Sequence, residues 1–556
     1  MEKINKLLHQ YLTEFFGFKK FKGNQEKAIK SIMMGTNTFV IMPTGGGKSL
    51  CYQLPAIIME GVAIIISPLI ALMKNQVDSI RSYAKNDHIA HFFNSTLNRD
   101  EVELVKEHVL NGTTKLLFVA PETISKEKHS IFFKKCNISF FAIDEAHCIS
   151  EWGHDFRPEY RKLKTTIKNI GHKPIMALTA TATKEVRKDI IKSLGIENNK
   201  LFISSFNRPN LYYEIRQQEN PDKEIIKFIK QHHNKSGIIY CLSRRKAEEI
   251  SELLNLNNIS SLPYHAGLEQ KIRKKTQDDF LMENINIIVA TIAFGMGIDK
   301  PDVRFVIHYN IPKSLENYYQ ETGRAGRDGG EGRCILFYDL KDVEKFQNFN
   351  SKKSATEKEI SKYLLQEMVS YVEDTECRRK KLLHYFNEDF SETQCEKNCD
   401  NCIVEYNSVN AQVDLLVILN AIAENENKFD LNQIILVLKG DTNATINNLN
   451  IEHLKCFKKG EHLTSKNIKK IIWKAITYDL INNDIVTNGR LTITNKGRLF
   501  LKNPAEFLIN DNITLNTKQN IPTKPFDPSL VLILKKLRKK IAEKMQMPPF
   551  IIFQDP

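Results

Sequence analysis

The chain alternates short apolar, β-branched runs with longer amphipathic stretches, and this alternation restricts the folds that it can adopt. Its first third contains the runs "TFVIMP", "VAIIISP", "KLLFVAP", "FFAIDEAH" and "PIMALTAT". Continuous apolar runs are typical of strands buried on both faces, as in a parallel sheet that helices cover. The pattern restarts after residue 205 with "SGIIYCLS", "INIIVAT", "VRFVIHYN" and "GRCILFYDL". We therefore predict two tandem α/β domains, each built on a parallel sheet.

The rest of the chain has a different character. From about residue 345 a charged helical pattern leads to a cysteine-rich turn, and further helical stretches end in "NDIVTNGRLTITNKG". There, Asn488 and Gly489 between β-forming residues predict a two-residue hairpin. Helices that end in such a hairpin favour a winged helix. The predicted boundaries are 1–204 and 205–344 for the α/β domains, 345–408 for a helical element, 409–503 for the winged helix, 504–525 for a polar linker and 526–556 for a C-terminal helical segment.

The chain is strongly basic. Its 556 residues carry a formal net charge of +14 at pH 7, with a pI near 9.0, so its surface attracts polyanions. Nucleic acid is the first candidate partner, although a lysine-rich solvated surface explains the charge equally well. The N-terminal "MEKINKLLHQYLTEFFGF" lacks the apolar core of a signal peptide, and no apolar run is long enough to cross a bilayer. We expect a soluble, intracellular protein that does not use a membrane.

A glycine-rich segment, "MPTGGGKS", follows a predicted strand and opens a predicted helix. In this context, backbone N–H groups and the N-terminal end of the helix can cradle phosphate oxygens. Lys48 would reach the outer phosphates and Ser49 would ligate Mg²⁺. Met42 replaces the first glycine of the general pattern, and such a loop by itself can arise by chance. The predicted cofactor-binding residues of the loop are Thr44, Gly45, Gly46, Gly47, Lys48 and Ser49.

Two further motifs supply the charges that nucleotide hydrolysis requires. "FAIDEAH" ends an apolar strand with Asp144, which can hold Mg²⁺, and Glu145, which can orient or deprotonate water. "YQETGRAGRDG" places Arg324 and Arg327 beside glycines in the second α/β domain, where guanidinium groups can stabilise charge on a triphosphate. Seen alone, these motifs also fit a solvated acidic turn and an exposed surface loop. Together with Lys48 they predict a catalytic site that depends on closure of a cleft between the two domains.

Four of the ten cysteines form a separate group in "CRRKKLLHYFNEDFSETQCEKNCDNC". Cys377, Cys395, Cys399 and Cys402 have the number and spacing of ligands that suit a closed tetrahedral Zn²⁺ site. A disulfide framework is disfavoured in a reducing compartment, and an iron–sulfur cluster remains an alternative. A zinc ion without an open coordination position would hold structure and would not catalyse a reaction.

Taken in order, these motifs resemble those of the RecQ family of DNA helicases, within helicase superfamily 2. The resemblance covers about the first 340 residues and is carried by "FGFKKFKGNQ", "TGGGKS", "SPLIALMKNQ", "DEAHCISEWGHDFRPEY", "LTATAT", "SFNRPNL", "YHAGL", "ATIAFGMGIDKPDVR" and "QETGRAGRDG". It implies two tandem RecA-like parallel-sheet domains, followed by a helical zinc-binding element and a winged-helix domain. The segment 526–556 resembles the beginning of an HRDC domain, a small helical nucleic-acid-binding module.

The resemblance assigns further residues to the nucleotide. The opening stretch of the family contacts the adenine, which here corresponds to Phe18 for stacking and Gln25 for reading the base edge. Lys22 stands where the family often has arginine, and a lysine lacks the planar fork of a guanidinium. Gln320, just before the arginine loop, is assigned to the nucleotide as well.

The segment after the acidic box, "CISEWGHDFRPEY", combines aromatic side chains with a guanidinium. Bases offer faces for stacking, worth about 1–3 kcal/mol each, and phosphates attract positive charge. In the RecQ family this aromatic-rich loop senses single strands, and a loop that here contains Gly295 and Asp299 links the strand to the nucleotide. The alternative is that Trp152 and Phe156 belong to the core, but the interleaved polar residues leave no apolar face. The predicted DNA-binding residues are Trp152, His154, Phe156 and Arg157.

The last third of the chain carries basic and apolar groups whose role the sequence leaves open. Arg378 and Arg379, beside the grouped cysteines, can contact DNA phosphates. A second basic group can engage duplex phosphates, although its lysines can equally form a solvated helix face: Lys466, Lys469, Lys470 and Arg490. The predicted hairpin tip carries no aromatic residue that would separate strands. One apolar stripe cannot be buried by the short C-terminal segment alone: Leu530, Leu534, Leu537 and Ile541.

The resemblance implies an ATP- and Mg²⁺-dependent DNA helicase that moves 3′ to 5′ on single-stranded DNA and unwinds duplexes in repair, recombination and replication. Its expected cofactors are ATP, Mg²⁺ and Zn²⁺. Its expected partners are single-stranded and duplex DNA, with a single-strand-binding protein as a candidate, and we expect a cytoplasmic, nucleoid-associated monomer. Two alternatives stay open: an RNA helicase or duplex translocase that never separates strands, and a catalytically silent DNA-binding scaffold.

Overall fold

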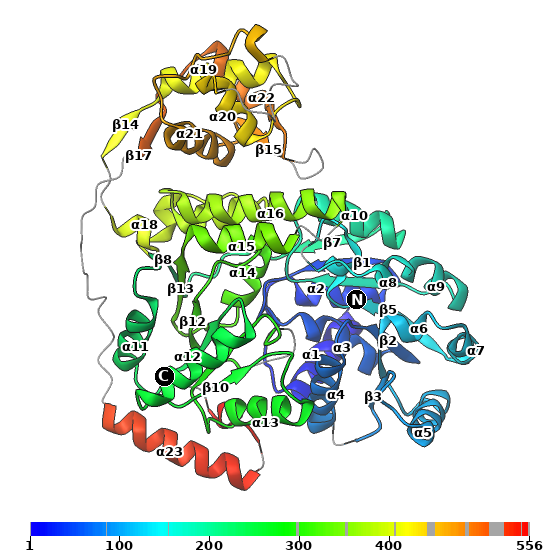
Figure 1. The fold of residues 1–556 in the computed structure, drawn as a ribbon. Helices are drawn as coiled ribbons and strands as arrows, with labels where there is room; N and C mark the ends of the chain where they lie inside the picture. The colour runs from blue at the N-terminus through cyan, green and yellow to red at the C-terminus, as the bar shows by residue number, and fades with distance from the viewer. Residues whose placement is uncertain are drawn as a thin grey trace.

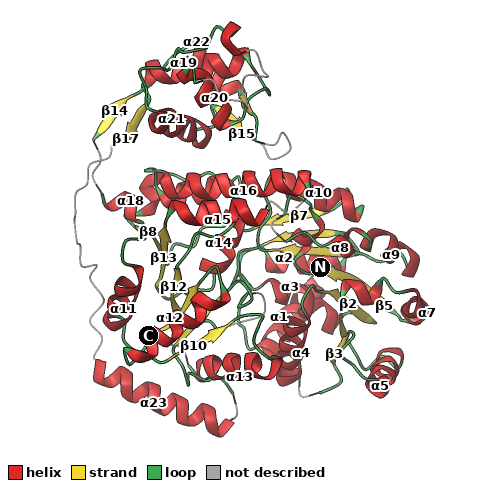
Figure 2. Ribbon diagram, viewed as in Figure 1, coloured by secondary structure: helices red, strands yellow, loops and turns green. Residues whose placement is uncertain are grey.

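The structure, a computed structural model, describes residues 2–84, 86–153, 155–295, 300–350, 354–404, 407–441, 451–483, 489–510, 528–545 and 547–553. Two α/β domains lie side by side, a helical element packs against them, and a small domain of helices and short strands lies beyond that element (Figure 1). Helices cover both sheets (Figure 2). The predicted fold class is confirmed by this arrangement.

The first α/β domain is built on seven parallel strands in the order β3-β4-β2-β5-β6-β1-β7. Every residue of β1, β2, β4, β5 and β6 is buried, as expected for continuous apolar runs between two layers of helices. Alternate side chains of β2 enter different cores, with Ile64 and Ile66 on one face and Ala63 and Ile65 on the other. The strands are β1 Thr38–Ile41, β2 Val62–Ile66, β3 Ala90–Phe93, β4 Leu116–Val119, β5 Ile138–Ile143, β6 Ile175–Thr179 and β7 Lys200–Ile203.

The two edge strands of this sheet, β3 and β7, are the ones that the apolar runs do not predict. β7 is mostly exposed, and His91 interrupts the apolar character of β3. No described helix has the length and hydropathy needed to cross a membrane. The helices of this domain are α1 Glu2–Phe16, α2 Gln25–Met33, α3 Lys48–Ile58, α4 Ile70–Ala84, α5 Arg99–Leu110, α6 Pro121–Ile124, α7 Glu127–Lys135, η1 Ala146–Ile149, α8 Pro158–Arg161, α9 Leu163–Ile170 and α10 Lys184–Leu194.

The second α/β domain repeats this plan with six parallel strands in the order β10-β11-β9-β12-β13-β8. Its strands are β8 Leu211–Gln217, β9 Ser236–Tyr240, β10 Ser261–Tyr264, β11 Ile287–Ala290, β12 Val303–His308 and β13 Gly332–Tyr338. Its helices are α11 Pro221–Gln231, α12 Arg244–Leu256, α13 Gln270–Leu281 and α14 Leu315–Thr322. Residues 204–210 connect the two sheets, so the junction expected near residue 205 lies between β7 and β8.

The helical element consists of α15 Leu340–Asn350, α16 Ala355–Glu373, α17 Arg378–Tyr385, η2 Glu392–Cys395 and α18 Asp400–Ile403. Its two neighbouring arginines are buried, with 5% and 2% of Arg378 and Arg379 exposed. Arg378 Nε donates to Asp400 over 2.9 Å, and Arg379 Nη2 donates to the carbonyl oxygen of Leu211 over 2.7 Å. The expectation that these arginines touch DNA phosphates is therefore wrong, because their donors are used inside the protein.

The small domain contains α19 Gln412–Glu424, α20 Leu431–Lys439, η4 Ile451–His453, α21 Ser465–Thr477 and α22 Asn495–Lys502, with the strand pairs β14 Ser408–Asn410 with β17 Leu508–Asn510 and β15 Ile481–Asn483 with β16 Leu491–Ile493. The two strands of the predicted hairpin are present, and Asn483 pairs with Leu491, a register that does not suit a two-residue turn at positions 488 and 489. Buried Leu491 sets this register. Gly489 has the expected positive φ of 74°, and Asn488 lies outside the described residues.

The C-terminal helices are α23 Pro528–Met545 and α24 Pro549–Ile552. They pack against the second α/β domain (Figure 1), where fully buried Arg538 donates to Glu283 over 2.8 Å. Three members of the predicted apolar stripe, Leu530, Leu534 and Leu537, stay exposed, and only the fourth, Ile541, is half-buried. The basic face of α23 is thus the one that contacts the rest of the chain.

Candidate nucleotide and nucleic-acid site

The glycine-rich loop connects β1 to α3. Gly45 and Gly47 both adopt left-handed φ values, of 79° and 77°, and Gly47 stands at the N-cap of α3. The positive φ of Gly47 disfavours a larger residue, and a Cβ there would lie 2.4 Å from Gln25 Nε2 and would displace that side chain. Lys48 Nζ folds back and donates to the carbonyl oxygen of Met42 over 3.3 Å. Positive-φ glycines before a helix N-terminus, with a lysine folded across them, make a loop that suits phosphate oxygens.

The two carboxylates of the acidic box follow β5 and have opposite electrostatic surroundings. Burial and the neighbouring Glu145 raise the pKa of the Asp144 carboxyl to about 7, against the opposing influence of Lys48. Burial also acts to raise the pKa of Glu145, but the hydrogen bond and charge of His147 outweigh it and hold that pKa below its usual range. Glu145 therefore stays ionised, whereas Asp144 becomes an anion when a cation binds beside it.

The second α/β domain brings its arginine loop against the glycine-rich loop. A Cβ on Gly45 would lie 3.1 Å from Arg327 Cγ, and a Cβ on Gly323 would lie 3.2 Å from Thr44 Cβ. Arg324 is buried, and its charge contributes to the lowered pKa of Glu145. The structure thus brings together residues from both domains that were predicted to be catalytic: Lys48, Asp144, Glu145, Arg324 and Arg327.

A chain of hydrogen bonds connects the acidic box to the second domain. His147 Nδ1 lies 3.3 Å from Glu145 Oε2 and 2.9 Å from Thr179 Oγ1. Thr181 N donates to Thr179 Oγ1 over 3.3 Å, and Gln320 Nε2 donates to Thr181 Oγ1 over 3.2 Å. His147 and both threonines are buried, so solvent does not replace these contacts. Gln320 of α14 is therefore connected through two buried threonines to His147, which pairs with Glu145.

Arg208 connects the two nucleotide-facing loops directly, and the sequence did not single it out. Its Nη1 donates to the carbonyl oxygen of Thr44 over 3.2 Å and to that of Gly323 over 3.3 Å. Its Nη2 donates to the carbonyl oxygens of Ala325 and Gly326 over 2.9 and 2.8 Å. One guanidinium thus ties the glycine-rich loop to the arginine loop. Its signals in the sequence are a charged residue in a short junction between the sheets and its place in the "SFNRPNL" motif that carries the family resemblance.

The residues assigned to the adenine lie beside the glycine-rich loop. Gln25 Nε2 donates to the carbonyl oxygen of Gly47 over 3.1 Å, and Gln25 Oε1 accepts from Lys22 N over 2.8 Å. The side-chain amide of Gln25 is therefore bonded to backbone groups and is buried. Phe18 is 53% exposed, so one aromatic face is open to a stacking partner.

The aromatic-rich loop folds back onto the acidic box. A Cβ on Gly153 would lie 2.7 Å from the carbonyl oxygen of His147, and Arg157 N donates to the carbonyl oxygen of Cys148 over 2.9 Å. Trp152 is half-buried against the core formed by Ile360 and Leu364 of α16. Loop, box and helical element are thus in direct contact.

The other side chains of this loop differ in how open they are. Phe156 is half-buried with Arg161 Cζ 5.9 Å from its ring centroid. Arg157 Nη1 donates to the carbonyl oxygen of Pro68 over 2.9 Å. His154 lies outside the described residues, as does Asp299 in the loop expected to link the strand to the nucleotide. A nucleic-acid strand that stacks on Phe156 would compete with Arg161 for the same ring face.

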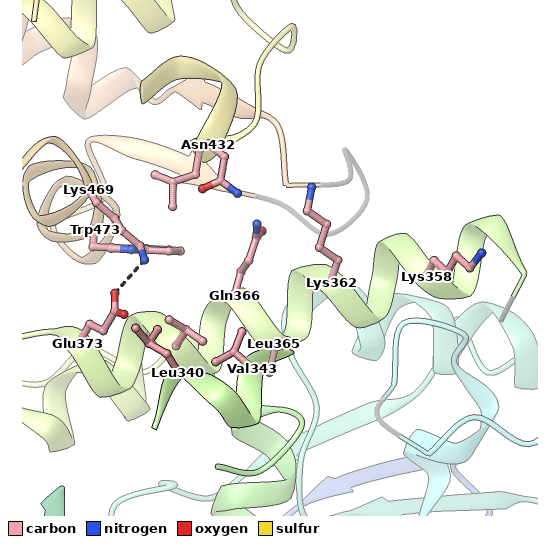
Figure 3. Close-up of a pocket in the computed structure, with 12 residues that line it drawn as sticks. Leu340, Val343, Lys358, Lys362, Leu365, Gln366, Glu373, Asn432, Lys469 and Trp473 are labelled. Atoms are coloured by element: carbon pink, nitrogen blue, oxygen red, sulfur yellow. Dashed lines mark hydrogen bonds and ion pairs between the residues drawn. The ribbon is translucent and has the colours of Figure 1, made fainter. Parts of the chain in front are cut away.

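The helical element and the small domain meet around a cavity of about 520 Å³ (Figure 3). At its rim Lys469 Nζ lies 2.8 Å from Glu373 Oε2, and Trp473 lines its wall. Lys470 Nζ donates to the carbonyl oxygen of Asn510 over 2.9 Å. Two of the basic residues that the sequence left open between duplex contacts and a solvated face therefore have partners inside the chain.

The four grouped cysteines converge. Their Sγ atoms lie within 4.8 Å of one another, and those of Cys377 and Cys399 are 4.0 Å apart. Zn–S bonds of about 2.3 Å in a tetrahedron require sulfur separations of about 3.8 Å, so the group fits Zn²⁺ with little adjustment. Cys377 and Cys399 stand at the N-caps of α17 and α18, and Cys395 ends η2, so one ion would fasten three short helices. The structure forms no disulfide between any of the ten cysteines, so it favours metal ligands over a disulfide framework.

Family models match successive parts of the chain. The matches are DEAD/DEAH box helicase at 22–189, Helicase conserved C-terminal domain at 221–329, RecQ zinc-binding at 340–403 and RQC domain at 405–517. They follow the order of the first sheet, the second sheet, the cysteine-bearing helical element and the small domain.

Whole proteins of known name are similar over most of the chain. The "ATP-dependent DNA helicase RecQ" of Pasteurella multocida is 38% identical over 556 residues, covering 98% of this chain and 86% of that protein. The protein of the same name in Bacillus subtilis is 36% identical over 550 residues, covering 98% of this chain and 91% of that protein.

Solved structures share the fold at low identity. The DEAD-box helicase Mss116 bound to single-stranded RNA aligns with a TM-score of 0.52 and 17% identity, covering 68% of this chain and 89% of that one. The Mycobacterium smegmatis helicase Lhr bound to single-stranded DNA aligns with a TM-score of 0.51 and 17% identity, covering 89% of this chain and 61% of that one. At this identity, these likenesses concern the fold alone.

Proposed function

The chain belongs to the RecQ family and is an ATP-dependent DNA helicase; from this premise we propose that it moves 3′ to 5′ along single-stranded DNA and unwinds duplexes in repair and recombination. The premise rests on four consecutive family matches and on identity of 36–38% over nearly the whole chain. The single observation that carries the mechanism is that charged groups of two separate sheets meet at one glycine-rich loop.

We propose that ATP lies between the two domains with its phosphates on residues 44–49. Lys48 would bind the outer phosphates, and Ser49 and Asp144 would hold Mg²⁺, which neutralises phosphate charge when it is bound. Glu145, kept ionised by His147, would orient the attacking water. Arg324 and Arg327 would stabilise the charge that develops as the bond to the γ-phosphate breaks. Phe18 would stack on the adenine, with Lys22 and Gln25 beside it, and Gln320 would connect nucleotide and box.

DNA stimulation follows from the contact between the aromatic-rich loop and the acidic box. We propose that a single strand binds Trp152, His154, Phe156 and Arg157 and so repositions Gly153, whose backbone rests on His147. Because His147 pairs with Glu145, binding of the DNA strand would change the position of the carboxylate that orients the attacking water. Gly295, whose Cβ would lie 3.9 Å from Arg324 Nη2, gives the strand a second route through the other domain.

The remaining parts of the proposal concern cofactors and partners. Cys377, Cys395, Cys399 and Cys402 would hold a structural zinc. The positive net charge supports binding of single-stranded and duplex DNA in the cytoplasm, near the nucleoid. We expect a monomer, and a single-strand-binding protein is the candidate protein partner.

The test compares duplexes with a 3′ tail and duplexes with a 5′ tail, in DNA and in RNA, with and without ATP. ATP-dependent separation of the 3′-tailed DNA alone supports the proposal, whereas preference for RNA or for the 5′ tail contradicts it. Lys48→Ala should keep DNA affinity and lose DNA-stimulated ATP turnover by at least about a hundredfold, since it removes a cation from the phosphates. Undiminished turnover in Lys48→Ala would refute the site assignment.

A further inference from the structure

Three histidines from separate elements meet at the edge of the first sheet, outside the nucleotide site. His88 precedes β3, His91 lies within β3 and His108 lies in the last turn of α5. Their ring nitrogens lie within 4.8 Å of one another. His91 Nε2 and His108 Nδ1 are 3.2 Å apart, and the ring centroids of His88 and His108 are 4.1 Å apart.

We propose that these three histidines bind a divalent transition-metal ion, for which Zn²⁺ is the probe, and that the ion fastens α5 to the edge strand β3. Zn–N bonds of about 2.0–2.1 Å in a tetrahedron place ligand nitrogens about 3.3 Å apart. The separation of 3.2 Å between His91 Nε2 and His108 Nδ1 matches this value. Imidazole nitrogens select zinc, copper or nickel over Mg²⁺ and Ca²⁺, so the site would not compete for the ion that accompanies ATP.

The three rings differ in exposure, since His91 is buried, His108 is half-buried and His88 is exposed. A metal bound between them would therefore be partly shielded by the edge of the sheet. His88 is exposed and its ring can turn toward the other two, which leaves the fourth coordination position to water.

Arg81 sets how tightly the ion is held. Its Nη2 lies 3.0 Å from His91 Nδ1, and its Nε donates to the carbonyl oxygen of Ala90 over 3.0 Å. A guanidinium only donates, so in the metal-free cluster Nδ1 accepts and the ring proton is on Nε2. Metal binding at Nε2 moves that proton to Nδ1, and Arg81 must then turn away. A side chain that accepts at this position would strengthen the site, because a ligating histidine donates its other N–H to an acceptor.

The consequence for the fold is local. β3 lies at one edge of the sheet and, among the described strands, pairs only with β4. An ion shared by β3 and the end of α5 would hold this edge strand against the helix that follows it. The site is distinct from the four cysteines, which lie in the helical element.

The experiment uses the full chain and counts zinc by mass spectrometry after equilibrium dialysis against micromolar Zn²⁺. The wild-type chain should hold one zinc more than His108→Gln, which keeps only the cysteine site. His172→Gln, a change at an exposed histidine of the same domain, should bind as the wild type does. Arg81→Gln should bind the second zinc about tenfold more tightly, since its amide oxygen can accept from His91 Nδ1.

Cobalt substitution distinguishes the two sites by their ligands. The second equivalent of Co²⁺ should add ligand-field bands without thiolate charge transfer, and His108→Gln should lose these bands while it keeps those of the cysteine site. A wild-type chain that holds a single zinc, or a second zinc that persists in His108→Gln, would overturn the proposal. An Arg81→Gln variant that binds zinc no more tightly than the wild type would overturn the role given to Arg81.

Discussion

Replacement of Arg208 by glutamine tests whether ATP hydrolysis depends on contact between the two nucleotide-facing loops. The guanidinium makes four hydrogen bonds to carbonyl oxygens, of which one, to Thr44, belongs to the first domain and three belong to the arginine loop. A glutamine amide is shorter and cannot serve both loops. The variant therefore removes the connection while it leaves the catalytic side chains in place.

The size of the effect follows from the bond that crosses between domains. A hydrogen bond from a charged donor contributes about 1.5–3 kcal/mol. Loss of the bond to Thr44 should destabilise the closed arrangement by that amount, which corresponds to a decrease of about 10- to 150-fold in DNA-stimulated kcat. The three bonds to the arginine loop lie within the second domain, so we expect their loss to lower thermal stability and not the closing equilibrium.

The assay is steady-state ATP hydrolysis with saturating single-stranded DNA, together with DNA affinity by fluorescence anisotropy and thermal unfolding by circular dichroism. Arg245→Gln is the matched control, since the side chain of Arg245 is 90% exposed and pairs with Glu249 on the surface of the same domain. DNA affinity should be unchanged in both variants. A kcat for Arg208→Gln within about twofold of the wild type, in a chain that is folded, would falsify the claim that this arginine holds the closed site.

Three other predictions concern the loop, the acidic box and the metal. Gly153→Ala should reduce the stimulation of ATP turnover by DNA more than basal turnover, because the new Cβ would lie 2.7 Å from the carbonyl oxygen of His147. Gly171→Ala, at a glycine with open space around it, is the control. Equal stimulation of the two variants by DNA would contradict a signal that passes from Gly153 to His147. Burial and Glu145 raise the pKa of Asp144 to about 7, and a carboxyl must ionise to bind Mg²⁺. The apparent affinity for Mg²⁺ should therefore fall about tenfold between about pH 8 and pH 6. An Mg²⁺ affinity that does not change with pH would count against Asp144 as a ligand. Chelation of zinc should lower the unfolding midpoint and DNA-stimulated turnover together, and a chelated chain with an unchanged midpoint would contradict the structural role.

The strands that line the nucleotide site could be predicted from the sequence, because they are buried on both faces and read as continuous apolar runs. β1 and β5, which lead into the glycine-rich loop and the acidic box, are of this kind. β7, at the edge, is mostly exposed and carries no such run. The functional loops follow the buried strands, and this explains why residue types and spacing were sufficient to propose Lys48 and Asp144.

The sequence could not reveal which polar side chains form hydrogen bonds to other groups within the protein. Arg378 and Arg379 read as phosphate contacts, yet both are buried and donate to Asp400 and to backbone carbonyls. Arg208 does not belong to a periodic pattern of residues, and it donates to backbone carbonyl oxygens. Since every residue has a carbonyl oxygen, the sequence does not show which ones Arg208 contacts. A side chain that binds main-chain groups of distant segments leaves no pattern along the chain, so only the fold identifies it.

The junction between the sheets also connects the zinc element to the nucleotide. Arg379 donates to the carbonyl oxygen of Arg208 over 2.6 Å, and Glu388 accepts from the backbone N of Phe206 over 2.6 Å. The helix that carries Arg379 begins directly after Cys377, so the cysteine site fixes where this helix starts. The same ion would therefore hold the segment from which Arg208 reaches both nucleotide-facing loops. We therefore expect a metal that performs no chemistry to influence whether the catalytic cleft closes, because the helix that begins beside Cys377 supports the junction that carries Arg208.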